Sequence, residues 1–129
     1  MTQFRGHSII DIPVFVDQLM RAAGGGAFLI IGVGDSDDFI QLSGDATGVQ
    51  LDFPMVTARQ QSKELIIRSV AKAEGLVLVE NYGSDGTRFL DFDIEPPAQR
   101  IADVCATMLR QVFDVSDRSE LFFELEGLD

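Results

Sequence analysis

The sequence predicts an α+β fold in which helices pack on one face of an antiparallel sheet. Three segments carry apolar residues at spacings of three and four, which is typical of amphipathic helices. Residues 27–53 and 76–94 lie between these segments and alternate apolar with polar side chains around Gly/Asp turns, as strands do when one face is packed and the other is wet. The expected order is therefore α-β-β-β-α-β-β-α.

The length of 129 residues fits a single domain spanning residues 1–129, and a core of this size needs no disulfide or metal. We expect residues 1–10 to be loose, because they precede the first helix signal. Residues 118–129 alternate weakly and could add a C-terminal edge strand before a tail. No apolar run is long enough to span a bilayer and no secretory signal is recognisable, so we expect a cytoplasmic protein without a membrane partner.

The first helix is expected to begin after Asp11, a favourable N-cap residue, with Pro13 in its first turn, and to end at Gly24. Its apolar stripe consists of Ile12, Phe15, Val16, Leu19 and Ala23. A short buried strand over residues 27–31 follows, with a turn at 34–37.

Two further strands, residues 39–43 and 49–53, form a hairpin around a Gly44-Asp45 turn, and Pro54 ends the ladder. The side chains expected to face the core are Ile40, Leu42, Val49, Leu51 and Phe53. Those expected to face outward are Phe39, Gln41, Gln50 and Asp52. The three strands should make an antiparallel meander.

The second helix is expected to start at a capping box formed by Thr57 and Gln60, and Gly75 is placed to end it. Its predicted apolar stripe is Leu65, Ile66, Val70 and Ala73. A second hairpin follows, with strands at residues 76–79 and 89–94.

Pro96 and Pro97 open the last predicted helix, whose apolar stripe is Ile101, Val104, Cys105, Met108 and Val112. A second apolar row is formed by Ala98, Ala102, Leu109 and Phe113. Such a wide apolar surface is buried twice or used in assembly. Leu109 and Phe113 are therefore candidate dimer contacts.

The charge of the chain bounds the kind of partner that it can bind. Twenty-one acidic residues against ten basic ones leave a net charge of −11. Such a surface repels phosphate backbones, so we expect no nucleic-acid binding. It would attract a cationic protein, although acidity can also simply keep a small protein in solution.

Few residues suit catalysis. His7 is the only histidine and lies in the segment expected to be loose, whereas a Ser-His-Asp or Cys-His arrangement needs rigid support. Cys105 is the only cysteine; in a buried helical stripe its thiol would be inert, and a lone cysteine agrees with a reducing compartment. One histidine and one cysteine also exclude the usual zinc sites. We expect no enzymatic activity and no cofactor.

Two segments resemble a phosphate-binding loop and a calcium-binding loop, but each lacks residues that such a loop needs. Residues 24–36 contain closely spaced glycines but lack the GK[ST] ending of a phosphate loop, so helix termination and a turn are the simpler interpretation. Asp35, Asp37 and Asp38 have half the spacing of a calcium loop, without its glycine and its final glutamate. We expect no metal site.

Three carboxylates should project from the wet face of the sheet: Asp52, Asp91 and Asp93. If their strands are neighbours, they form one acidic patch suited to arginine or lysine from a partner. A carboxylate pair for glycoside hydrolysis is an alternative, but the chain has no tryptophan to stack on a sugar. Solvated carboxylates are the simplest interpretation.

The order of elements, the size and the acidity resemble class I type III secretion chaperones and the related YbjN and TY-Chap (type III secretion chaperone-like) proteins. By element order the resemblance covers residues 11–113, and its most family-like segments are GVQLDFP, the helix start TARQ and the hairpin GSDGTRFLDFDI. These families share an architecture rather than a catalytic signature. The resemblance implies a homodimer that holds a non-globular segment of a partner protein in extended form along hydrophobic patches.

We therefore expect a non-enzymatic acidic protein that binds and masks one cognate polypeptide, a secreted effector or a toxin. One alternative is an immunity protein that neutralises a cationic antibacterial toxin by direct binding, since charge pairing favours fast and tight inhibition. A small hydrolase is a less favoured alternative. The candidate partner-binding residues are Phe39, Gln41, Gln50, Asp52, Phe89, Asp91 and Asp93.

Overall fold

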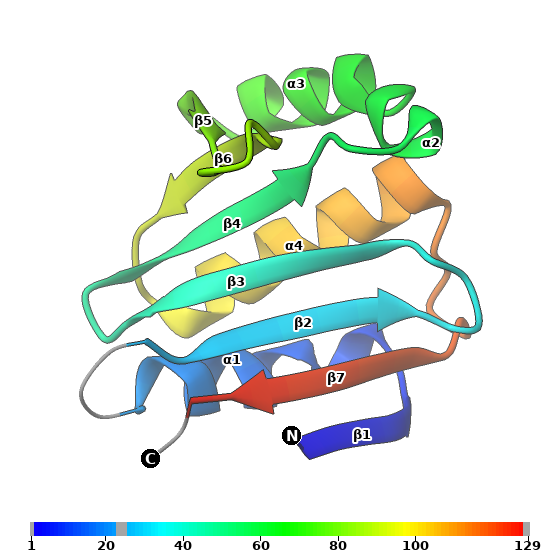
Figure 1. The fold of residues 1–129 in the computed structure, drawn as a ribbon. Helices are drawn as coiled ribbons and strands as arrows, with labels where there is room; N and C mark the ends of the chain where they lie inside the picture. Colours follow the sequence, from blue (N-terminus) through cyan, green and yellow to red (C-terminus); the bar gives the residue numbers. More distant parts are fainter. Residues whose placement is uncertain (1, 23–25, 128–129) are drawn as a thin grey trace.

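The computed structural model describes residues 2–22 and 26–127, and it shows one seven-stranded antiparallel sheet with helices packed against it (Figure 1). The strands are β1 (Thr2–His7), β2 (Phe28–Val33), β3 (Phe39–Asp45), β4 (Gly48–Pro54), β5 (Leu78–Tyr82), β6 (Arg88–Ile94) and β7 (Leu121–Glu126). The helices are a 3-10 turn η1 (Ile9–Asp11), α1 (Ile12–Met20), α2 (Ala58–Gln61), α3 (Glu64–Ala73) and α4 (Ala98–Phe113). Across the sheet the strands follow the order β1-β7-β2-β3-β4-β6-β5. The predicted α+β class is confirmed, whereas the predicted order of elements is only partly matched.

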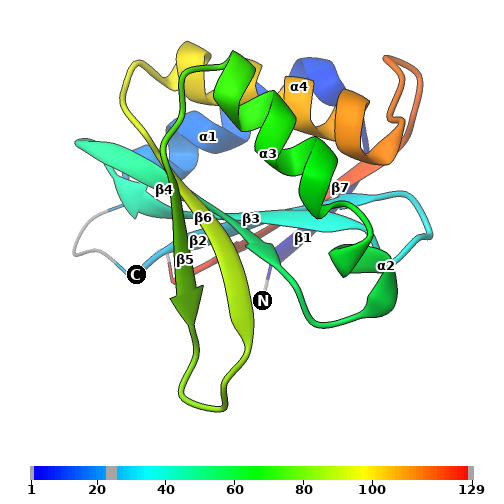
Figure 2. The same cartoon turned by 90° about the horizontal axis from the view of Figure 1, so that it is seen from above.

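The core lies between the sheet and a single layer formed by α1, α3 and α4, which Figure 2 shows on the same side. Strand alternation produces this arrangement, because every second side chain points toward the helices. The side chains predicted to point inward from the central hairpin are all buried: Ile40, Leu42, Val49, Leu51 and Phe53. The antiparallel meander of β2, β3 and β4 is also confirmed.

The sheet twists strongly toward its β5 edge. In Figure 2, β5 and β6 run almost across the direction of β2 and β3, and the turn that joins them extends to the side away from the helices. Right-handed strand twist accumulates across a wide sheet, so the outermost hairpin is rotated most. The β5–β6 hairpin therefore extends beyond the central strands on the side that the helices leave uncovered.

The segment before the first helix is strand β1, and the expectation that residues 1–10 are loose is wrong. β1 pairs with β7, and the ring of Phe4 lies 5.3 Å from that of Phe15 on α1. His7 Nδ1 lies 3.1 Å from Asp11 Oδ2, so the histidine is held rather than loose. Alternation in this strand is hard to recognise in the sequence because only one of its side chains, Phe4, is strongly apolar and packed on the core.

The C-terminal strand β7 lies inside the sheet, between β1 and β2. The prediction of an edge strand is wrong because it did not include β1 as an outer neighbour. The helix-facing side chains of β7 are fully or almost fully buried: Leu121, Phe123 and Leu125. Phe123 stacks on Phe15 with a centroid distance of 4.1 Å and an interplanar angle of 7°. β7 is thus part of the core.

The second predicted helix begins at the expected capping box. Gln60 N–H donates to Thr57 Oγ1 at 3.1 Å, and the Gln60 side chain accepts from Thr57 N–H at 3.0 Å. The helix is broken between α2 and α3, which changes the face that meets the sheet. Leu65 is 83% exposed, and the predicted stripe is right only at Val70 because the buried residues are Ile67, Val70 and Ala71. Gly75 follows α3 with a left-handed φ of 73°, as expected of a residue that ends a helix.

The first helix has the predicted buried stripe from Ile12 to Leu19. The Asp11 side chain does not cap it but accepts a hydrogen bond from Ser8 N–H at 3.0 Å, which stabilises η1. α1 ends at Met20. The predicted stripe residue Ala23 and the predicted helix end at Gly24 lie outside the described residues.

Helix α4 begins after Pro97, as predicted, and its main apolar stripe is buried. Leu109 is 0% exposed because α4 lies between α1 and α3 and packs on both as well as on the sheet. The expectation that Leu109 contacts a second copy is therefore wrong. Phe113 is half-buried and its ring lies 6.5 Å from that of Phe53, so it too packs mainly within the chain.

Within the part of the chain that the structure describes, no helix has the length and apolar character needed to cross a membrane.

The two neighbouring phenylalanines of β7 should differ sharply in their effect on stability. Phe123→Ala is expected to lower the free energy of unfolding by about 3–5 kcal/mol, because it removes a buried ring that stacks on Phe15. Phe122→Ala, on the opposite face of the same strand, should cost only about 1 kcal/mol. Urea unfolding followed by circular dichroism measures both, and equal losses would contradict the assignment of the two faces.

Candidate functional site

The face of the sheet that the helices leave uncovered carries all seven residues predicted to bind a partner. We call it the open face and define it by the outward side chains of β3, β4 and β6 together with their neighbours on β2, β5 and β7. Its central row consists of Gln41, Asp52 and Asp91, which are direct cross-strand neighbours. The aromatic row, one step along the same strands, consists of Phe39, Pro54 and Phe89. The polar row on the other side consists of Ser43, Gln50 and Asp93.

Asp52 of β4 and Asp91 of β6 stand directly opposite each other in the central row. Cross-strand neighbours have Cβ atoms only about 5 Å apart, so the two carboxyl groups meet. Asp91 is 5% exposed, which corrects the expectation that it projects into water. The reason is strand β5, because Asn81 of that strand donates its side-chain amide to Asp91 Oδ2 and Val79 pairs with Asp91 across the ladder.

The second oxygen of Asp91 is the least satisfied group of the face. Asp91 Oδ1 is buried, and it has no hydrogen-bond partner in the described part of the chain. Burial, the hydrogen bond with Asp91, and the charges of Asp91 and Asp93 together raise the pKa of Asp52 to about 8. Two carboxyl groups this close share one proton, because both cannot readily ionise. A proton on Asp52 would place an O–H donor directly across the ladder from Asp91.

The charges that face Asp52 are all negative. Asp91 and Asp93 project from β6, while β3 contributes the neutral Gln41 and β5 contributes the neutral Asn81 and Val79. Among the described residues, no arginine or lysine forms an ion pair with these carboxyl groups. In the described part of the chain these carboxyl groups therefore concentrate negative charge without an ion-pair partner. Arg5 of β1, near the opposite edge of the sheet, lies over the Phe122 ring at 5.2 Å.

Aromatic side chains border the central row. Phe39 and Phe89 are each partly exposed, and Pro54 lies directly beside Phe89 on the neighbouring strand. On β7, Phe122 covers Gly32 of β2, where an added Cβ would lie only 2.0 Å from the ring. Apolar groups next to a carboxyl pair exclude water and strengthen its electrostatic interactions.

Two hollows lie near the ends of the outward rows. Near Phe39, a cavity of about 20 Å³ has room for about one water molecule, but its lining includes Phe53 and Ile67, so it opens toward the helix layer. At the polar row of the open face, a shallow depression of about 390 Å³ is lined by Ser43, Gln50 and Asp93, among others. The depression at the polar row has the space that a side chain of a partner would need.

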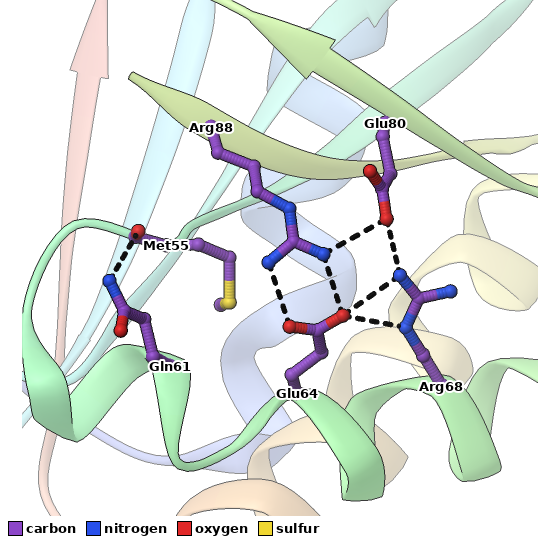
Figure 3. A network of polar contacts seen from close by, with 6 residues as sticks. All are labelled: Met55, Gln61, Glu64, Arg68, Glu80 and Arg88. Atoms are coloured by element: carbon purple, nitrogen blue, oxygen red, sulfur yellow. Dashed lines mark hydrogen bonds and ion pairs between the residues drawn. The ribbon is translucent and has the colours of Figure 1, made fainter. Parts of the chain in front are cut away.

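An ion-pair network on the opposite side of the β5–β6 hairpin holds this hairpin against α3 (Figure 3). Glu64 of α3 accepts two hydrogen bonds from Arg88 of β6, at 2.7 and 2.6 Å, and a third from Arg68 Nε at 2.8 Å. Glu80 of β5 accepts from both arginines. The arginines, Arg88 first and Arg68 second, lower the pKa of Glu64 to about 2. The network fixes the strand from which Asn81 reaches Asp91.

The other candidate groups are engaged elsewhere. Asp38 forms a bidentate ion pair with Arg59, at 2.8 and 2.6 Å, which lowers the pKa of Asp38 and removes it from the half calcium loop. Cys105 is fully buried, and burial raises the pKa of its thiol to about 12. In the described ranges, no group of three His, Cys, Asp or Glu side chains is placed to hold a metal ion.

Several residues of the open face were not among the predicted site residues, and Asn81 and Phe122 are the most informative of these. Asn81 could have been found from the hairpin register, because pairing Asn81 with Phe89 places it on the same face as Asp91. Phe122 could not, since its place over Gly32 depends on the pairing of β7 with β2.

No protein-family model matches this chain, and comparisons with curated proteins and with solved structures find no match. The resemblance to secretion chaperones consequently stays a hypothesis.

Replacing Asp52 should change how stability depends on pH. In the folded state Asp52 keeps its proton up to about pH 8, whereas the unfolded chain releases it near the ordinary value of about 3.9. The folded state binds more protons between these values, so stability falls as pH rises through this window. Asp52→Asn cannot ionise and should exceed the parent at pH 9 by on the order of 2 kcal/mol. Urea unfolding at pH 5, 7 and 9 tests this, and parallel curves would contradict it.

Glu64→Gln should show the opposite pH dependence. The folded-state pKa of Glu64, about 2, lies below the unfolded value of about 4.3, so its contribution is complete above the unfolded value and is lost as pH falls toward 2. The variant should be less stable than the parent at pH 6, and the difference should vanish near pH 2. Unfolding midpoints between pH 2 and 6 measure this, and a constant difference would show that Arg88 and Arg68 do not stabilise the carboxylate.

Proposed function

We propose that this protein binds a cationic segment of another polypeptide on the open face and catalyses no reaction. The observation that carries the proposal is the Asp52–Asp91 pair on a face that no described helix covers. This pair has an acidic neighbour in Asp93 and forms no ion pair with a described arginine or lysine, and an aromatic row lies beside it. A partner with basic and apolar side chains would satisfy both kinds of surface.

Charge selects the partner. The net charge is −11, and the open face has the same sign. Two copies of this chain would therefore repel each other through their open faces, whereas a basic polypeptide would be attracted and steered toward them. The acidity of the open face therefore favours a different protein over a second copy as the occupant.

The geometry of the open face favours an extended segment. Side chains on one face of a strand repeat about every 6.6 Å, and neighbouring strands lie about 4.8 Å apart. An extended peptide that runs parallel to the strands presents its own alternate side chains at the same spacing of about 6.6 Å. This arrangement supports a chaperone-like role in which the segment is held unfolded. A folded basic toxin, the immunity alternative, would bind the same charges with a compact surface.

The shape of the face also supports binding over catalysis. The carboxyl pair lies on a sheet surface, and the depression beside it is shallow. Catalytic sites usually enclose a substrate in a cleft and exclude water around the reacting atoms. We therefore assign the pair to recognition.

A homodimer, which the resemblance to secretion chaperones implies, stays a prediction that static light scattering measures. Because Leu109 is buried, it does not offer the contact that the sequence suggested, while Phe113 is half-buried.

A defined peptide tests the proposed function. The protein should bind the extended octapeptide Ac-(Arg-Thr)4-NH2 and not Ac-(Glu-Thr)4-NH2, with an affinity that falls as salt rises. Amide chemical shifts in NMR titrations should change on β3, β4 and β6. Asp93→Lys, which reverses an exposed charge of the polar row, should weaken binding by about tenfold.

The matched control is Asp103→Lys, the same change at an exposed position on α4. It should weaken binding less than about twofold, since the site is remote and screened. Equal losses in the two variants, or shift changes confined to the helices, would reject the open face as the site. Protease sensitivity of a natural partner in the complex would then separate an extended client from a folded toxin.

A further inference from the structure

The open face contains one acid whose protonation is tied to its neighbour. Asp91 is 5% exposed, and its Oδ1 is buried without a permanent donor in the described part of the chain. Its other oxygen is occupied by Asn81. Among the described neighbours of Asp91, the group that can supply a removable proton is the Asp52 carboxyl, which stands directly across the ladder. A buried acceptor that depends on a removable proton marks a place where another donor can enter.

We propose that the Asp52–Asp91 pair is a receptor for the guanidinium group of an arginine from the partner, and that this arginine enters in exchange for the proton that the two carboxyl groups share. This inference rests on the proposed function and names the chemical group that the open face recognises.

The shape of a guanidinium fits the pair. Its planar fork carries five N–H donors and can contact two carboxylate groups at once. Asp52 is partly exposed, whereas Asp91 is buried, so the arginine approaches through Asp52. Once the shared proton leaves, repulsion between two carboxylates turns Asp52 outward and opens Asp91 to the ligand. The amide of Asn81 keeps Asp91 in position throughout.

The surroundings of the pair suit a cation, and no described arginine or lysine forms an ion pair with it. The charged groups that face Asp52 are Asp91 and Asp93 of β6; β3 presents Gln41, and β5 presents Asn81 and Val79. The one acid of β5, Glu80, points to the other side and is bound to two arginines of this chain. Those same arginines show that this fold binds guanidinium groups between carboxylates where it supplies both partners.

The carboxyl pair releases one proton for each arginine that it binds. The free pair has one proton and a charge of −1; the bound pair has no proton, a charge of −2 and a guanidinium of +1. One proton passes to the solvent for each arginine bound below pH 8, and none well above it. By linkage, affinity should rise about tenfold per pH unit below this value and level off above it.

Small ligands test the inference on the intact protein. The probes are N-acetyl-arginine methylamide, its lysine counterpart, and the citrulline counterpart, which has nearly the shape of arginine but no charge. Carbon-13 NMR of the Asp52 and Asp91 carboxyl groups at pH 6 to 9 reports both binding and ionisation. At pH 7, arginine should move the Asp52 signal from its acid to its carboxylate position, and citrulline should not.

Two variants complete the test. Asp52→Asn keeps the shape and can donate its amide to Asp91; it should fold, weaken arginine binding by at least tenfold and abolish the pH dependence. Asp103→Asn makes the same substitution at an exposed position on α4 and should retain the dependence. Equal binding of citrulline or lysine, a pH-independent affinity, or an unchanged pH slope in Asp52→Asn would overturn the inference. If the arginine octapeptide binds the open face without proton release, only this inference fails; if it does not reach the open face, the proposed function fails as well.

Discussion

One-sided coverage of the sheet is the constraint on which the rest of the molecule depends. Helices α1, α3 and α4 all lie on the same face, so every strand must place apolar side chains on that face and tolerate water on the other. The core is complete within this single layer, as the burial of the central inward residues shows. The open face therefore has no helix layer to pack against, and many of its side chains stay partly exposed.

The open face combines two features that are costly in isolation. Asp91 is a buried carboxyl group that has only one donor of its own, and Asp52 is held in a form that the unfolded chain does not keep at neutral pH. The network around Glu64 and Arg88 on the other side of the hairpin offsets this by attaching β5 and β6 to α3. Carboxyl groups with unfavourable electrostatic surroundings, held in place by a rigid scaffold, are typical of binding sites.

The sequence was most informative where a pattern is local. The alternation over residues 39–53 and the capping box at Thr57 are short-range signals, and the structure has both. The side of α3 that packs on the sheet depends on a break between α2 and α3, and no proline or glycine in the sequence marks this break. The predicted stripe was therefore wrong apart from Val70. The burial of Leu109 depends on two neighbouring helices, and the position of β7 depends on β1, which are relations between distant segments. For the candidate site, the row of residues followed from alternation, whereas the coupling of Asp52 to Asp91 required the register between β4 and β6.

The pairing of β1 with β7 has a consequence for synthesis on the ribosome. Among the described strands β1 pairs with β7 alone, and β7 also pairs with β2. When the ribosome has released the chain only as far as α4, the strand that lies between β1 and β2 is still missing. Phe15 then lacks Phe123, the ring on which it stacks. Such a chain exposes an unpaired edge of β2 until residues 121–126 emerge. The fold is therefore expected to form only after the exit of β7, and aggregation before that moment depends on how quickly translation supplies it.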